Sequence, residues 1–147
     1  MDARTARYLV FLGAAVVVAD ARPHPGDGPT LNVPKQRALG EALARRLGDH
    51  SDDDRARLVR DVLAITPTFE GGLAFLRRVE DAARRLGAGL DDAERWEVVG
   101  ELARIAEADA SVSFPELTVI RAVVANIGVP RPHQVDADSG VVLLPGA

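Results

Sequence analysis

The sequence contains no cysteine. Disulfides, thiolate zinc ligands and cysteine nucleophiles are therefore excluded from its chemistry. It also has only one tyrosine and one tryptophan, too few to build the aromatic platforms on which single-stranded nucleic acids stack. Positive charge is sparse as well, because 18 basic residues face 22 acidic ones and the net charge is −4. That balance leaves no basic footprint, so we expect no nucleic-acid partner.

Recognisable catalytic and phosphate-binding motifs are also missing. Gly26-Asp27-Gly28 lies between prolines and matches neither a Walker A loop nor the dinucleotide fingerprint. The three histidines, His24, His50 and His133, are not accompanied by a serine nucleophile in a known motif. We therefore predict that the protein is not an enzyme and that it has no catalytic residues.

The longest apolar run, residues 8–19, is too short to cross a membrane, because a spanning helix needs about 20 apolar residues. Arg4 and Arg7 before it resemble the start of a signal peptide, although the acidic Asp2 is atypical of one. The run is better explained as a helix that is buried on nearly all sides. Together with the absence of cysteine, this predicts a cytoplasmic protein with no membrane span.

Helical periodicity is what the sequence does contain. Apolar residues recur every three or four positions, and proline, glycine and capping residues separate the segments. The predicted helices cover residues 4–20, 34–48, 51–66, 67–86, 91–109 and 113–128, with a short seventh after Arg131. The loop 21–32 contains three prolines, which block helix and strand alike. We predict an all-α bundle of six to seven helices, in one domain over 1–134 with an extended tail over 135–147.

Two finer expectations concern packing. Gly71-Gly72 lies within the fourth predicted helix, where two glycines would allow a second helix to cross closely. Glu94, Glu97 and Glu101 lie on one face of the fifth predicted helix, since residues three and four apart are neighbours on a helix. Such a stripe is typical of a solvent-exposed face.

Two parts of the helical array carry the same signature. An apolar helix ends in Ala19-Asp20 and another ends in Ala108-Asp109. In both parts a loop follows, and the next helix begins beside a proline, Pro34 or Pro115. A duplicated helical hairpin is the simplest explanation of this internal similarity.

The second copy, from Glu101 to Ile120, reads ELARIAEADASVSFPELTVI. It resembles the tellurite-resistance TerB-like domain, in which an apolar helix ends in Ala-Asp-Gly and a glutamate opens the next helix. The resemblance covers most of 5–130 and implies a two-repeat helical bundle, a non-enzymatic binding or scaffold module of the bacterial stress response with a protein partner. It also implies that acidic residues hold a divalent cation such as Ca²⁺, and the residues that carry over are Asp20, Asp109 and Glu116.

The chain departs from the family pattern at two kinds of position. Ala21 and Ala110 replace the glycine that follows the aspartate. Lys35 and Gln36 stand where the first copy would have its acidic residue. A symmetric pair of carboxylates is therefore not expected, and any metal site would be built mainly from the second copy.

The same acidic residues also have a structural interpretation. Glu116 completes a capping box with Ser113, in which each side chain accepts a hydrogen bond from the other residue's backbone. Asp109 then simply ends a helix. Its loop does not match an EF-hand, because the closing glutamate comes too early and the turn glycine is absent.

Three functions remain open at the level of sequence. The first is a scaffold module that binds a divalent cation. The second is an adaptor without metal, which recognises a protein through a groove between the repeats or through the apolar segment 141–144 of the tail. That segment either packs on its own bundle or joins copies into a homo-oligomer. The third is a small enzyme or sensor with an acid-lined pocket.

Overall fold

The computed structural model describes residues 2–19, 22–24, 28–30, 33–65 and 72–129. Six helices form the bundle, which confirms the predicted all-α architecture. They are α1 (Ala3–Ala19), α2 (Val33–Arg46), α3 (Asp52–Ile65), α4 (Leu73–Ala88), α5 (Asp92–Glu107) and α6 (Phe114–Ile127). The seventh helix after Arg131 and the tail 135–147 lie outside the described residues.

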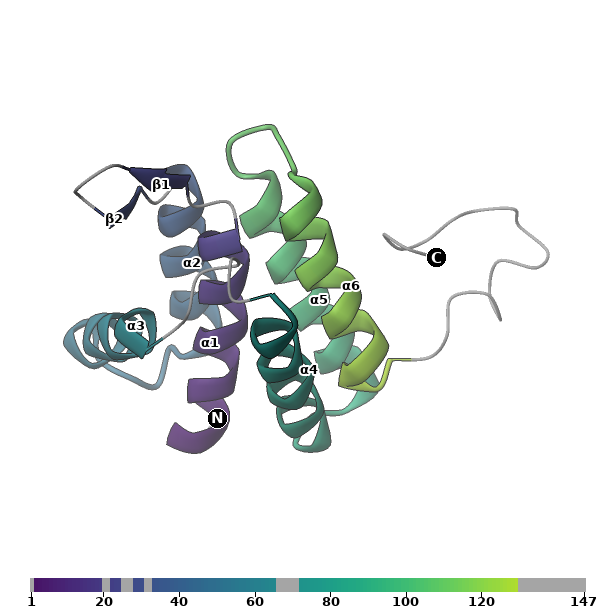
Figure 1. The fold of residues 1–147 in the computed structure, drawn as a ribbon. Coiled ribbons are helices and arrows are strands. Elements are labelled where there is room, and N and C mark those ends of the chain that lie inside the picture. Colours follow the sequence, from purple (N-terminus) through teal and green to yellow (C-terminus); the bar gives the residue numbers. More distant parts are fainter. Residues whose placement is uncertain (1, 20–21, 25–27, 31–32, 66–71, 130–147) are drawn as a thin grey trace.

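Helix α1 forms the centre of the bundle. It contacts each of the five other helices, and Figure 1 shows it between the α2–α3 side and the α4–α6 side. Every residue from Leu9 to Ala19 is buried, as predicted for a helix that is apolar on nearly all sides. No helix in the described ranges has both the length and the apolar character needed to span a bilayer.

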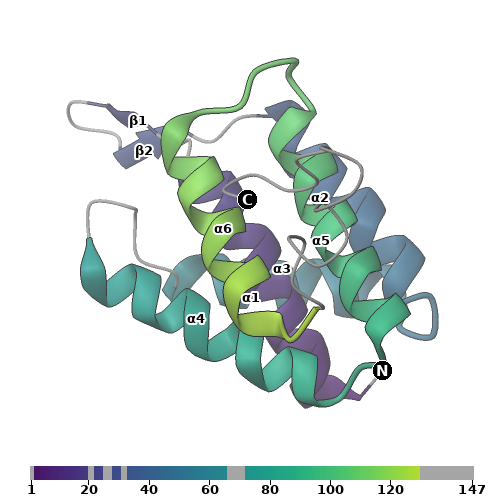
Figure 2. The same ribbon diagram turned by 90° about the vertical axis from the view of Figure 1, so that its right-hand side faces the viewer.

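Three predicted helix caps are confirmed, although α4 and α5 end at Ala88 and Glu107 rather than at 86 and 109. Asp91 with Glu94 and Ser113 with Glu116 form complete capping boxes at the starts of α5 and α6. At the end of α6, Gly128 adopts the left-handed conformation with φ of 98°, which glycine reaches without steric cost. The Ser113 cap fixes where the α5–α6 loop ends, and Figure 2 shows this loop at the same end of the bundle as the β1–β2 hairpin.

The expectation that prolines exclude strands from 21–32 is wrong. β1 (Arg22–His24) pairs antiparallel with β2 (Gly28–Thr30), and Pro23 lies opposite Pro29. Antiparallel residue pairs alternate between pairs that exchange two backbone hydrogen bonds and pairs that exchange none. Two opposed prolines occupy a pair of the second kind, so this short ribbon loses no ladder bond to them.

The predicted close crossing at Gly72 is also wrong. Gly72 is the exposed N-cap of α4, with φ of 61°, and a Cβ added there would meet no atom within 4 Å. The N-terminal part of the predicted helix, 67–71, lies outside the described residues. The close crossing occurs at Gly87 instead, where an added Cβ would overlap the backbone carbonyl of Ile127. Gly87 therefore sets how closely α4 and α6 approach.

Candidate functional site

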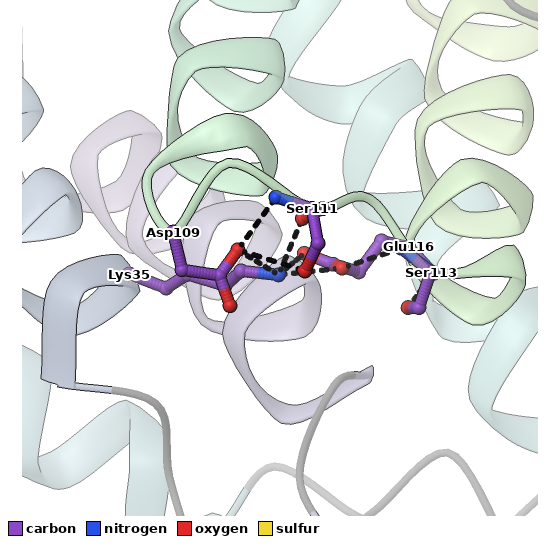
Figure 3. A network of polar contacts seen from close by, with 5 residues as sticks. All are labelled: Lys35, Asp109, Ser111, Ser113 and Glu116. Carbon is purple, nitrogen blue, oxygen red and sulfur yellow. Dashed lines mark hydrogen bonds and ion pairs between the residues drawn. The ribbon is translucent and has the colours of Figure 1, made fainter.

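The candidate metal ligands of the second copy lie at the end of the bundle where α2 and α6 begin. Asp109 lies in the loop between α5 and α6, and Glu116 lies in the first turn of α6. The side chain of Lys35, from the first turn of α2, points between them (Figure 3). Asp20 lies outside the described residues. The structure therefore brings Asp109 and Glu116 together around a lysine that the sequence analysis treated only as a departure from a pattern.

The ammonium group of Lys35 is surrounded by oxygen atoms. Its Nζ donates to both carboxylate oxygens of Glu116 at 2.6 Å and to the backbone carbonyl of Ser111 at 3.3 Å. It also lies 3.4 Å from Oδ1 of Asp109. The side chains of Lys35 and Glu116 are 0% exposed, and that of Asp109 is 22% exposed. Because buried charges are costly unless paired and hydrogen-bonded, removing either Lys35 or Glu116 alone would leave the other charge buried and uncompensated.

The loop around Lys35 is held by its own hydrogen bonds. Oε1 of Glu116 accepts from the backbone N–H of Ser113 at 2.9 Å, which confirms the predicted capping box. Oδ1 of Asp109 accepts from the backbone N–H of Ser111 at 3.1 Å. Ala110, between Asp109 and Ser111, has φ of 64°, a left-handed conformation that residues other than glycine rarely adopt. These contacts hold both carboxylates toward the ammonium group.

This donor set does not fit a divalent cation in its present arrangement. Ca²⁺ takes about six to eight oxygen ligands, whereas the positive Nζ of Lys35 already lies in hydrogen-bond contact with both oxygens of Glu116. Within the described part of the chain, no three histidine, aspartate or glutamate side chains are grouped so that they could hold a metal ion. The sequence signal for this arrangement was the opposite charge of Lys35 and Glu116 at matching places in the repeat.

A second ion pair joins α2 to α5 and corrects the interpretation of the glutamate stripe. Glu94 and Glu97 are exposed as predicted, but Glu101 is only 3% exposed. Arg45 donates two hydrogen bonds to the carboxylate of Glu101, from Nε at 3.1 Å and from a terminal nitrogen at 2.7 Å. The hydrogen bond from Arg45 lowers the pKa of Glu101 below its ordinary value. Spacing alone could not show this, because Arg45 lies 56 residues away in sequence.

A hollow of about 340 Å³ lies between α1, α3 and α4. Its apolar surface comes from Phe11, Val62 and Ala82, which are buried, and from the half-buried Tyr8. Around these residues stand four charged side chains, all exposed: Arg7, Arg77, Arg78 and Asp81. We call this surface the arginine groove. Sequence reasoning missed it, because its residues come from three helices and no local spacing connects them.

The charged residues that line the arginine groove are mostly basic. Asp81, the one acidic side chain among its described lining residues, pairs with Arg85 at 2.9 Å along α4. The guanidinium of Arg78 lies 5.3 Å from the centre of the Phe11 ring, a cation–π distance. Hydrogen bonding to Arg4 lowers the pKa of Tyr8 below its ordinary value of 10.0. Arginines thus approach this one face from both α1 and α4.

The hollow between α2 and α3 is larger, about 590 Å³, but its charges are mixed. Arg37 and Arg55 are balanced there by Glu41 and Asp52. The arginine groove differs because three arginines and one aspartate line it among the described residues. In a chain of net charge −4, such a concentration of positive charge favours an anionic ligand.

Comparison of the chain with protein-family models, with curated proteins and with solved structures found no match.

Proposed function

We propose that the chain is a TerB-like, non-enzymatic helical module of the bacterial cytosol that binds a protein partner and uses no metal ion. The observation that carries this proposal is the arginine groove, a concave surface with an apolar floor and a charged rim. Aromatic residues and arginine are enriched at protein interfaces, where they supply most of the binding energy. Helix-lined grooves of this kind accept an amphipathic segment of a partner.

We call the contacts of Lys35 with Asp109 and Glu116 the lock, and we infer that their role is structural. Helices α2 and α6 each have 14 residues, and Lys35 and Glu116 are the third residue of each. This match supports a duplicated hairpin in which equivalent positions carry opposite charges. Two carboxylates at these positions would repel each other unless a cation lay between them. A lysine facing a glutamate removes that need, so we infer that the lock closes without metal.

The alternative of an enzyme or sensor with an acid-lined pocket has less support. The arginine groove is lined by arginines, and the one carboxylate among its described lining residues, Asp81, is 52% exposed and paired with Arg85. General acid–base chemistry near neutral pH needs a group whose pKa lies near the working pH, and arginine stays protonated throughout.

The test is a selection of random displayed peptides of about twelve residues on the full chain, a length that suits helix-in-groove recognition. Each enriched peptide is then measured against Ala82→Leu, which places a larger side chain into the hollow, and against Ala125→Leu, an exposed position on α6 outside the groove. We expect binding to survive Ala125→Leu and to be lost in Ala82→Leu. Circular dichroism and thermal unfolding check that both variants fold. Peptides that bind the two variants equally well would contradict the proposal.

A further inference from the structure

We propose that the arginine groove recognises an acidic, amphipathic protein segment, whose carboxylates meet the arginine rim while one or two apolar side chains enter the hollow. This inference rests on the proposed function and adds the chemistry of the partner to it. The geometry supplies both parts: Phe11, Val62 and Ala82 form the apolar floor, and Arg7, Arg77 and Arg78 surround it.

The charge of the groove selects the sign of the ligand. Arg77 and Arg78 are neighbours in sequence and both are exposed, and Arg7 faces them from α1 across the hollow. Guanidinium groups bind carboxylates through paired hydrogen bonds, which compact ammonium groups cannot form in the same geometry. Like-charged partners would be repelled from this face, so the rim excludes basic segments.

The floor of the groove selects a segment that also carries apolar side chains. A volume of about 340 Å³ lies near the lower limit of small-ligand pockets, about 300 Å³, and it accommodates one or two apolar side chains of a peptide. The exposed rim lets the rest of such a segment continue along α4. A flat anionic bilayer would contact the arginines but would not fill a hollow, so the concave shape favours a peptide.

The test measures binding of labelled synthetic peptides to the full chain by fluorescence anisotropy. The acidic peptide carries leucine and phenylalanine at helical spacing and glutamate on the flanking positions, and its control has every glutamate replaced by glutamine. We expect saturable binding of the acidic peptide that weakens with added salt, and binding of the glutamine peptide that is at least several-fold weaker. Arg77→Gln should weaken binding of the acidic peptide by about 1.5- to 5-fold, the range of an exposed ion pair.

Arg121→Gln removes an exposed arginine on α6, outside the groove, and should leave the affinity unchanged. Equal binding of the acidic and glutamine peptides, both blocked by Ala82→Leu, would overturn the charge inference while leaving the protein-binding function intact. Absence of binding by either peptide, with no peptide selected in the groove, would overturn both. Binding of vesicles with about one-third phosphatidylserine, lost in Arg77→Gln but without any peptide binding, would assign the surface to anionic lipid and overturn the inference.

Discussion

Nζ of Lys35 lies 2.6 Å from both carboxylate oxygens of Glu116, and the two residues hold the same position in helices of equal length. This contact joins the start of α2 to the start of α6, 81 residues apart in sequence. It also places a positive charge where a cation between the two acidic residues would have to lie. The lock thus explains how the carboxylate of Glu116 is buried without a metal ion beside it.

Removing one partner of the lock should destabilise the protein strongly. We expect Lys35→Met to lower the free energy of unfolding by about 3–5 kcal/mol, since it leaves the carboxylate of Glu116 buried and unpaired. Adding Glu116→Gln, which keeps the capping geometry, should restore part of that loss. Denaturant unfolding of both single variants and the double variant measures the coupling. Additive losses would contradict a direct interaction, and Arg121→Gln serves as the surface control.

Close packing of α4 on α6 should make Gly87 intolerant of any side chain. An added Cβ overlaps the backbone carbonyl of Ile127. Alanine intrinsically favours a helix over glycine by about 1 kcal/mol, but we expect Gly87→Ala to lower the free energy of unfolding by several times that amount. Gly100→Ala is the matched control, because nothing lies within 4 Å of an added Cβ there. Thermal unfolding should show the first variant less stable and the second at least as stable as the wild type. Equal changes in stability for the two variants would contradict the close approach of α4 and α6 at Gly87.

The left-handed backbone of Ala110 predicts a stabilising substitution. Its φ of 64° strains a residue with a Cβ by roughly 1 kcal/mol, and glycine relieves that strain. Ala110→Gly should therefore raise the free energy of unfolding by up to about that amount. Ala108→Gly, at a right-handed position with φ of −61°, should lower it. A loss of stability in both variants would show that the conformation at 110 is not strained.

Glu101 predicts a dependence of stability on acid pH. Arg45 lowers the pKa of Glu101 in the folded state, so this pair's contribution is complete above the unfolded pKa and disappears as the pH falls through the lower folded pKa. We expect the unfolding free energy of the wild type to fall across that range more steeply than that of Glu101→Gln. The matched control is Glu97→Gln, because Glu97 is 54% exposed. Parallel curves for wild type and Glu101→Gln would contradict the pairing.

The only tyrosine reports on the edge of the arginine groove. Hydrogen bonding to Arg4 lowers the pKa of Tyr8, so ultraviolet titration of tyrosinate should give a midpoint below 10.0. Arg4→Gln should move the midpoint upward, because the hydrogen bond from Arg4, the largest contribution that stabilises the tyrosinate, is lost. Arg121→Gln should leave it unchanged. A wild-type midpoint at or above 10.0 would contradict this contact.

The helices could be predicted from the sequence because their signals are local. Capping residues such as Ser113 and Glu116 lie three positions apart, and the apolar repeat of the predicted helix 34–48, at Leu39, Leu43 and Leu47, matches one helix face. All three leucines are buried, as expected. Local signals failed where proline pairing or a backbone crossing decides the structure, as at Pro23 opposite Pro29 and at Gly87 against Ile127.

The candidate site could be predicted only in part. The family resemblance selected Asp109 and Glu116 together, but it did not show that Lys35 lies between them. Glu101 looked exposed because its own helix gives no indication of Arg45 on α2. The arginine groove could not be predicted from the sequence, since its floor combines residues of three helices. Contacts between distant segments are set by how the helices pack, which periodicity does not determine.

The most direct test of the lock is calorimetric titration of the full chain with Ca²⁺ and Mn²⁺. If Lys35 already occupies the position between the carboxylates of Asp109 and Glu116, neither ion should give saturable heat that depends on these residues, and the melting temperature should not change on adding either ion. Saturable binding that is abolished by Asp109→Asn and by Glu116→Gln would contradict the account, because it would show that a metal ion competes successfully with Lys35 for these oxygens.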